Sequence, residues 1–199
     1  MTRLLLVRHA PTAATRAGAF PLDEPLDDAG RAAAASLADT LPADAAAVCS
    51  PARRCLQTAA TLGLRPKVDA RLRECDFGRW AGRTLAELDA EDPAATRAWM
   101  LDPAAAPHHG ESLLDFHARV GAWLADLAAG PGAVTVAVTH GGVVRSAVTH
   151  ALNAPPAVIW RIAVPPLSVT ALDVGDDGFV TLLEPTRPML APFASATAV

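Results

Sequence analysis

Two short apolar runs, each followed by a histidine, constrain the fold of this chain most strongly. Residues 4–7 (Leu-Leu-Leu-Val) stop at Arg8-His9, and residues 133–139 (Ala-Val-Thr-Val-Ala-Val-Thr) stop at His140. An uninterrupted apolar run of this length is typical of a strand that is buried on both faces. Polar side chains at the carboxyl ends of such strands mark the edge where open α/β sheets bind ligands.

The rest of the chain alternates between strand and helix signals. We predict further strands at 45–49, 67–68, 159–164, 167–174 and 179–183, and helices at 27–41, 51–62, 84–90, 93–101, 113–127 and 141–152. This alternation predicts an α/β protein, a three-layer α/β/α sandwich with a mostly parallel sheet. The turn sequence Gly-Asp-Asp-Gly at 175–178 predicts a terminal hairpin that supplies an antiparallel edge.

The composition fits one globular domain. Of the 199 residues, 51% are hydrophobic and 19% are charged, which excludes a disordered chain. We predict a single domain over residues 1–184, with a loop at 10–26. The segment 71–111 is expected to be an insertion that caps the carboxyl edge of the sheet. The proline-rich residues 185–199 are expected to form a loose C-terminal tail.

Charge and hydropathy exclude several kinds of partner. The formal net charge is −4 and no basic run occurs, so nucleic acid is not an expected partner. No apolar run approaches the ~20 residues of a membrane span, and the first one is shorter than the ~7–15 residues of a signal-peptide core. The three cysteines lack the spacing of a metal site. We therefore expect a cytoplasmic protein, away from membranes, with a homodimer as the default assembly.

Three basic side chains are predicted to meet at one edge of the sheet. His9 and His140 follow strands, and Arg54 lies in the first turn of the helix after the second strand. The helix N-termini at Pro51 and Gly141 point to the same carboxyl edge in a doubly wound sheet. Arginine forks and helix N-termini favour oxyanions, so this edge is predicted to bind a tetrahedral oxyanion, with phosphate as the obvious candidate.

The residue types at this edge also predict phosphoryl transfer. A neutral imidazole is a nucleophile near neutral pH because its unperturbed pKa is ~6.5. A second, protonated histidine would add a hydrogen-bond donor to the phosphoryl oxygens, and arginine would offset their charge. The departing alkoxide needs an acid, which Glu74 can supply from a loop with aromatic neighbours. The alternative for Glu74 is a surface ion pair with Arg71 or Arg73.

Five motifs then occur in a characteristic order. They lie at Leu6–Thr12, Ser50–Ala59, Leu72–Gly82, Gly110–Ser112 and Val138–Arg145. Together they resemble the histidine phosphatase superfamily, in the branch of cofactor-dependent phosphoglycerate mutases, fructose-2,6-bisphosphatases and α-ribazole phosphatases. The resemblance spans residues 3–150 and implies a phosphoglycerate mutase-like fold.

The resemblance implies a role for each matching residue. His9 becomes the nucleophile that forms phosphohistidine, and Glu74 becomes the proton donor and later the base that activates water. The transferring phosphoryl group is then held by the remaining matched groups, namely Arg8, Arg54, His140 and the backbone N–H of Gly141. Arg53 is not expected to take part, because the family arginine occupies the fifth place of the Ser-Pro motif. The resemblance implies neither a metal nor an organic cofactor.

The sequence departs from the family pattern after the nucleophile. Ala10 stands where glycine is usual, and Pro11 where an acidic residue is usual. Many members carry an asparagine that binds phosphate at the position of Thr15, whose hydroxyl can still donate one hydrogen bond. Phosphate binding through Thr15 is therefore expected to survive. Ala81 stands in place of a glutamate that supports the loop rather than the reaction.

Several functions fit these residues. The first is metal-independent hydrolysis of a small phosphate ester through phosphohistidine. The second is phosphoglycerate mutase-type transfer, but mutases use extra basic residues for the substrate carboxylate, and the loop 10–26 offers only Arg16. The third is a phospho-ligand binding module without catalysis. The substrate is open: Phe20, Trp80 and Trp99 would suit a bulky or aromatic leaving group. His108 and His109 either line the substrate entrance or are exposed loop residues.

Overall fold

The two apolar runs of the sequence are neighbouring strands in the middle of a sheet. The computed structural model describes residues 1–38, 40–42, 44–128 and 134–189. Within these ranges six strands form one sheet in the order β3-β2-β4-β1-β5-β6. β1 (Thr2–Arg8) pairs in parallel with β4 (Val134–Thr139), and the register places Arg8 opposite Thr139. The polar residues that follow both strands therefore emerge side by side.

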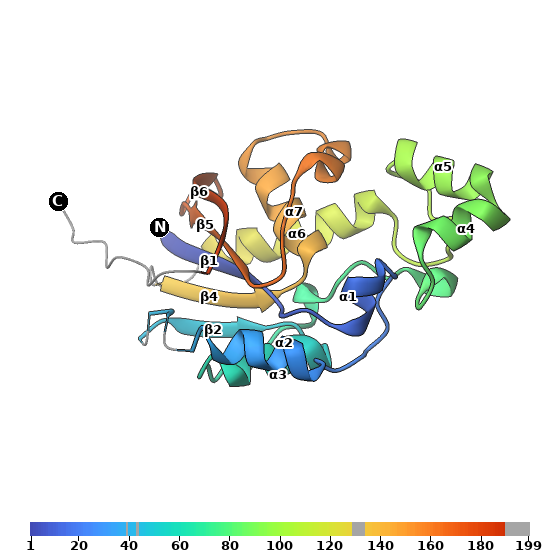
Figure 1. The fold of residues 1–199 in the computed structure, drawn as a ribbon. Helices are drawn as coiled ribbons and strands as arrows, with labels where there is room; N and C mark the ends of the chain where they lie inside the picture. Colours follow the sequence, from blue (N-terminus) through green and yellow to red (C-terminus); the bar gives the residue numbers. More distant parts are fainter. Residues whose placement is uncertain (39, 43, 129–133, 190–199) are drawn as a thin grey trace.

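Side chains of β1 alternate between two hydrophobic cores, as a strand buried on both faces requires. Leu4 and Leu6 pack into the core beneath α6 (Leu113–Ala128) and α7 (Gly141–Ala151). Leu5 and Val7 pack into the core of the opposite face, which includes buried residues of α3 (Arg53–Thr61). Figure 1 shows α6 and α7 on one side of the sheet and α2 and α3 on the other. The predicted three-layer α/β/α sandwich is confirmed.

The remaining strands complete a mixed sheet. β2 (Ala46–Cys49) and β3 (Lys67–Val68) continue the parallel part. β5 (Ser168–Val174) is antiparallel to β1, and β6 (Val180–Pro188) is antiparallel to β5. The turn between β5 and β6 is closed by the N–H of Gly178, which donates to Gly175 O at 2.9 Å. The predicted hairpin and antiparallel edge are both present.

Two predictions near the C-terminus need correction. Residues 159–164 are not a strand: Pro156–Arg161 form a 3-10 helix, η3, that begins with Pro156 in its first turn. Proline fixes φ and lacks an N–H for a strand ladder, and β1 already has strand neighbours on both sides. The sheet also extends into the predicted tail 185–199, because β6 ends only at Pro188. Residues 190–199 of that tail lie outside the described residues.

Two helices, α1 and α2, precede α3 in the described chain. A short helix, α1 (Ala13–Ala17), interrupts the predicted loop 10–26 and begins with a capping box between Thr12 and Thr15. α2 (Asp28–Ala35) begins at the predicted acidic cap, Asp27, whose carboxylate accepts from Gly30 N at 2.7 Å. It ends six residues before the predicted limit of 41. No helix within the described ranges is both long and apolar enough to cross a membrane.

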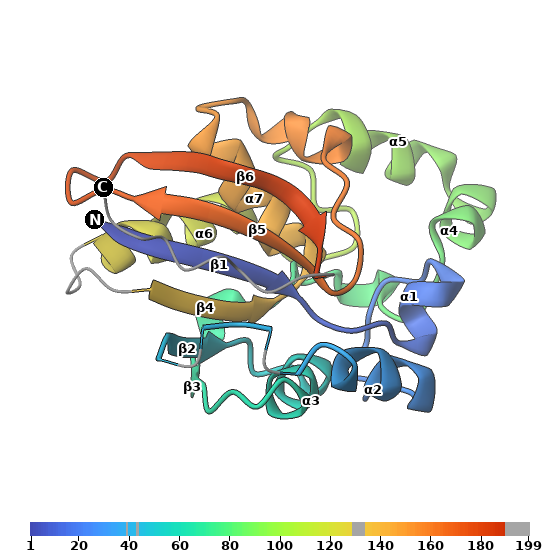
Figure 2. The same ribbon diagram turned by 60° about the vertical axis from the view of Figure 1, so that its left-hand side comes forward.

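The segment 71–111 lies beyond the carboxyl ends of the central strands. It contains most of η1 (Ala70–Leu72), all of η2 (Gly78–Trp80), α4 (Leu85–Glu91) and α5 (Pro93–Leu101). Figure 2 shows α4 and α5 away from the main sandwich, on the side towards which β1 and β4 point. This segment, called the cap below, has a separate hydrophobic cluster of Trp80, Leu88 and Trp99.

Candidate active site

His9 is a buried, neutral imidazole at the end of β1. Its side chain is only 5% exposed, and its Nδ1 lies 2.7 Å from Ala10 O. A carbonyl oxygen only accepts, so Nδ1 carries the ring proton and Nε2 keeps its lone pair. Burial, together with the nearby charges of Arg54 and Arg8, lowers the pKa of His9 to about 3, although the bond to Ala10 opposes this shift. The ring is therefore neutral at neutral pH, with its single proton on Nδ1.

His140 faces His9 from the end of β4. The ring centroids are 5.3 Å apart, in an edge-to-face arrangement. Arg54 NH2 donates to His140 Nδ1 at 3.2 Å, so the other nitrogen, Nε2, carries the proton and donates to Ser50 Oγ at 2.7 Å. Complete burial and the charge of Arg54 keep the pKa of His140 well below its usual value. The protonated second histidine of the sequence analysis is thus neutral in this structure.

Two arginines flank His9. Arg54, on α3, is 3% exposed, and its NH1 donates to Leu22 O at 2.7 Å. Arg8 donates from NH1 to Val164 O and is packed so closely on the start of α7 that a Cβ at Gly141 would lie 3.3 Å from Arg8 Nε. The Nε atoms of both arginines are buried and make no hydrogen bond within the described residues. Each guanidinium therefore keeps donor capacity for an anion.

Glu74 lies near His9 and the two arginines, and it comes from the loop between η1 and η2. Its Oε2 accepts from Gly142 N at 3.1 Å, and its Oε1 accepts from Cys75 N at 3.1 Å. A Cβ at Gly142 would lie 2.1 Å from Glu74 Oε1, so the sequence needs glycine there for the carboxylate to reach α7. Glu74 makes no ion pair with Arg71 or Arg73, which bond to other carboxylates. The surface alternative for Glu74 is therefore wrong.

These groups line one small pocket. It has a volume of about 80 Å³, and His9, Arg8, Arg54 and Glu74 all contribute to its wall. Thr15 lines it too, but its hydroxyl lies 2.9 Å from Thr12 Oγ1 within the capping box of α1. Glu24 is the sixth polar side chain of this wall, with its Oε2 3.8 Å from Arg54 NH1. The two arginines supply the positive charge that an oxyanion in this pocket would require. His140 and Gly141 do not line this pocket, but His140 lines a neighbouring cavity of about 440 Å³ that shares Arg54 and Glu74 with it.

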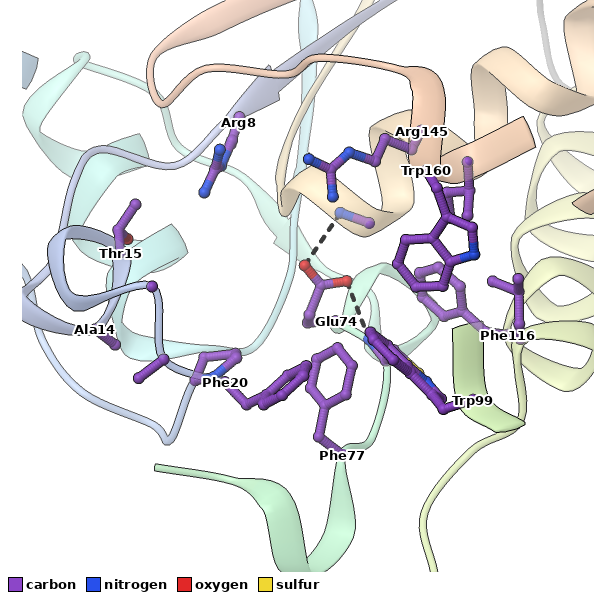
Figure 3. A pocket seen from close by; sticks show the side chains of 17 residues that line it. Arg8, Ala14, Thr15, Phe20, Glu74, Phe77, Trp99, Phe116, Arg145 and Trp160 are labelled. Atoms are coloured by element: carbon purple, nitrogen blue, oxygen red, sulfur yellow. Dashed lines mark hydrogen bonds between the residues drawn. The ribbon is translucent and has the colours of Figure 1, made fainter. Parts of the chain in front are cut away.

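A larger cavity of about 380 Å³ opens next to this pocket. The two share Arg8, Thr15 and Glu74. Its other walls are largely aromatic and come from the loop after α1, the cap, α6 and η3: Phe20, Phe77, Trp99, Phe116 and Trp160. Figure 3 shows the guanidinium groups of Arg8 and Arg145 and the carboxylate of Glu74 pointing towards the same space.

The residues that line the larger cavity differ in part from those expected from the sequence. Trp80 does not line it, because the indole is 3% exposed and packed inside the cap. His108 is fully buried there and accepts from Gly110 N at 3.0 Å, whereas His109 is an exposed loop residue. Arg145, which we did not single out from the sequence, also lines the cavity. The spacing of Arg145 on α7, one helical turn after Gly141 and Gly142, was the available signal for it.

The structure is an α/β sandwich in which His9, two arginines and Glu74 line one pocket at the carboxyl edge of the sheet. Residues 4–184 match the family model of the histidine phosphatase superfamily, branch 1. The chain belongs to the histidine phosphatase superfamily, and it is an enzyme of the phosphomonoester hydrolase class, as the resemblance implied.

Relatives with solved structures support this assignment. The glucosyl-3-phosphoglycerate phosphatase of Mycobacterium tuberculosis is 36% identical over 175 residues, which cover 79% of this chain and 78% of that protein. The structure of a mycobacterial glucosyl-3-phosphoglycerate phosphatase in complex with VO3 is 32% identical, with a TM-score of 0.81 over 94% of this chain and 100% of that one. The α-ribazole phosphatase of Shigella flexneri is 26% identical, with a TM-score of 0.82 over 98% and 100% of the two chains.

Proposed function

We propose that the chain hydrolyses a small phosphate monoester through a phosphohistidine at His9, without a metal ion. The observation that supports this most is the neutral His9 ring, with Nε2 unprotonated and two arginines beside it in a pocket for one oxyanion. An uncharged imidazole is the nucleophilic form, and the burial of the ring maintains it. Arg8 and Arg54 would hold the phosphoryl oxygens and offset the charge that develops on them.

The first step transfers the phosphoryl group to the protein. His9 Nε2 forms a bond to phosphorus while the bond to the ester oxygen breaks, and the electron pair leaves with that oxygen. Glu74, in its protonated form, gives its proton to this oxygen, so the product departs as an alcohol. The N–H groups of Gly142 and Cys75 hold the two carboxyl oxygens in place on the wall of the pocket.

The second step releases phosphate. Glu74, now ionised, accepts a proton from a water molecule whose oxygen attacks the phosphorus of phosphohistidine. The N–P bond breaks, and Nε2 recovers its lone pair while Nδ1 still donates to Ala10 O. Inorganic phosphate leaves, and Glu74 is again protonated for the next cycle. Proton and charge balance in this scheme without a metal, so we expect turnover to be unchanged after treatment with a chelator.

Hydrolysis is favoured over the mutase alternative by the state of Arg16. This residue is the one basic side chain of loop 10–26, and its NH2 bonds to Asp27 at 2.6 and 2.7 Å, which leaves it engaged away from substrate. The named relatives are phosphatases as well. Their names specify a glucosyl-phosphoglycerate and α-ribazole, so we propose that this chain also acts on a metabolite whose leaving group is bulky enough to fill the aromatic cavity.

Trapping the intermediate tests the proposal. Wild-type protein and His9→Ala are mixed with an aryl phosphate and quenched in alkali, which preserves phosphohistidine, and phosphorus NMR is recorded. We expect a transient N–P signal in the wild type and none in the variant, together with loss of product. Turnover that persists in His9→Ala would rule out the mechanism. Phosphate binding by both proteins with no turnover in either would favour a binding module.

The remaining expectations complete the proposal. We propose that the enzyme works in the cytoplasm on a free small-molecule ester, with neither nucleic acid nor membrane as partner. The homodimer stays the default assembly. Light scattering after size-exclusion chromatography tests it, since a mass near 20.6 kDa would indicate a monomer.

A further inference from the structure

Glu74, the proposed acid and base, lies in a loop that belongs to no helix or strand. Glu74 lies between η1 and η2, where residues 73–77 form neither helix nor strand. The side chain has to keep its carboxyl group near the phosphoryl pocket in both steps of the reaction. The position of this carboxyl group therefore depends on the contacts that hold the backbone of the loop.

Arg119 of α6 holds that backbone with its guanidinium group. Its NH1 donates to Arg71 O at 2.5 Å and to Arg73 O at 3.1 Å, and its NH2 donates to Glu74 O at 3.4 Å. The carbonyl between them, Leu72 O, accepts from Thr139 Oγ1 at 2.8 Å, directly before His140. Four consecutive carbonyls of the loop are thus fixed, three by one side chain and one by the end of β4.

Glu111 orients the arginine. Its two carboxylate oxygens accept from Arg119 Nε at 2.8 Å and from NH2 at 2.7 Å, and both side chains are 11% exposed. Together with the three carbonyls, this bidentate pair uses all five N–H groups of the guanidinium. The ring of Phe116 lies beneath the guanidinium, 5.0 Å away. A lysine could satisfy neither the fork nor the number of acceptors.

The backbone of Glu111 is itself joined to the Glu74 loop. Its N–H donates to Asp76 O at 2.8 Å. Gly110 lies so close to the same carbonyl that a Cβ there would be 2.0 Å from Asp76 O, and a Cβ at Gly78 would be 2.1 Å from His108 O. The Gly-Glu-Ser motif therefore packs backbone to backbone against the loop. This close approach explains the glycine, and the pair with Arg119 explains the glutamate.

We propose that Arg119, oriented by Glu111, is a positioning residue that sets the carboxyl group of Glu74 for proton transfer. Arg119 touches neither of the cavities that form the site, so it acts through the loop and not on substrate. The inference rests on the proposed function, because it needs Glu74 to be the acid. Its mark is a dependence on the leaving group: an alkoxide needs the proton, whereas a nitrophenolate departs without it.

The test is a single-turnover measurement of alcohol release for Arg119→Lys and Arg119→Gln. Two substrates are compared, an alkyl phosphate and p-nitrophenyl phosphate. We expect release of the alkyl alcohol to slow by about 10- to 100-fold, the range that an ångström of misplacement costs. Release of nitrophenolate should change by less than about threefold. The substrate concentration that gives half of the maximal single-turnover rate should stay close to that of the wild type. Glu111→Gln, whose amide keeps one acceptor oxygen but puts an NH2 donor against the other N–H of Arg119, breaks half of the fork and should give an intermediate loss.

Arg83→Gln is the matched control. It breaks another arginine pair of the cap, with Glu91 at 2.5 Å, in which both side chains are exposed. Both substrates should react at the wild-type rate in this variant. Equal losses for the two substrates, or none, in Arg119 variants with native circular dichroism would overturn the inference. A wild type that turns over neither ester would instead refute the proposed function. Faster hydrogen exchange at Cys75 N in Arg119→Lys would then still support the conclusion that Arg119 holds the Glu74 loop. Unchanged exchange would overturn that conclusion.

Discussion

The phosphate pocket and the aromatic cavity beside it are built in different ways. The pocket takes His9 and Arg54 from the carboxyl edge of the central strands, and both are at most 5% exposed. The cavity takes its walls from the cap and η3, where Trp160 is 38% exposed and rests on Trp99 at a centroid distance of 4.6 Å. If the proposed function holds, we expect the sheet to fix the chemistry and the cap and η3 to select the leaving group.

The largest expected effect comes from Arg54 in the inner pocket. Arg54→Gln removes a charge from the phosphoryl oxygens and the donor to His140 Nδ1. We expect kcat/KM to fall by roughly 100- to 1,000-fold, the loss typical of a removed electrostatic stabiliser. The loss should be the same for small and bulky esters, as steady-state kinetics with both would show. A loss confined to bulky esters would contradict the division between pocket and cavity.

A substitution where pocket and cap meet should have a smaller effect. Gly142→Ala would place a Cβ 2.1 Å from Glu74 Oε1, so the carboxylate has to move away from α7. We expect kcat for an alkyl phosphate to fall by about 10- to 100-fold with little change in KM. Thermal unfolding of the variant serves as the control. A normal kcat would mean that Glu74 is not the acid.

Acid should destabilise the protein through the inner pocket. The pKa of His9 is about 3 in the folded protein and ~6.5 when unfolded. Below pH 6.5 the unfolded chain binds the extra proton, so stability falls as the pH drops, down to pH 3. From pH 7 to 5 the contribution of His9 to the loss is about 2 kcal/mol. Urea unfolding at both pH values measures it, and His9→Asn should flatten the dependence.

A second histidine outside the site adds to this acid sensitivity. Burial and the stacked ring of His150, at a centroid distance of 3.6 Å, lower the pKa of His117 to about 4. The sign is the same as for His9, so stability from this group is present above pH 6.5 and lost towards pH 4. Because inorganic phosphate would bind only the folded pocket, it should offset part of the loss. His117→Asn should remove its share of the pH dependence but leave that phosphate effect unchanged.

The smallest expected effect belongs to the aromatic cavity. Trp160→Ala removes an edge-to-face contact with Trp99 and one wall of the cavity. We expect kcat/KM for a bulky aryl ester to fall by about 2- to 10-fold, as a loss of 0.5–1.5 kcal/mol implies. The rate with a small alkyl phosphate should not change. If both substrates lost activity equally, η3 would be part of the catalytic pocket and not of a separate wall.

The sequence by itself determined the core of the sheet and the edge where the site lies. Apolar runs at β1 and β4 predict buried strands, and His9 and His140 follow them directly, so chain direction alone places both at the carboxyl edge. Arg54 follows from the same rule, one turn into α3. These are local relations, in which a residue's position along the chain fixes its position on the fold.

Only the tertiary structure decided what surrounds that edge. Trp80 and Trp99 are equally apolar in the sequence and both are buried in the cap, but only Trp99 also lines the larger cavity. Arg145 and Arg119 both lie on helices, and what each contacts depends on which loops those helices meet. Residues 159–161 of the predicted strand 159–164 belong instead to the 3-10 helix η3, which contributes Ile159 and Trp160 to the cavity wall. Such contacts join segments far apart in the chain, and no local pattern encodes them.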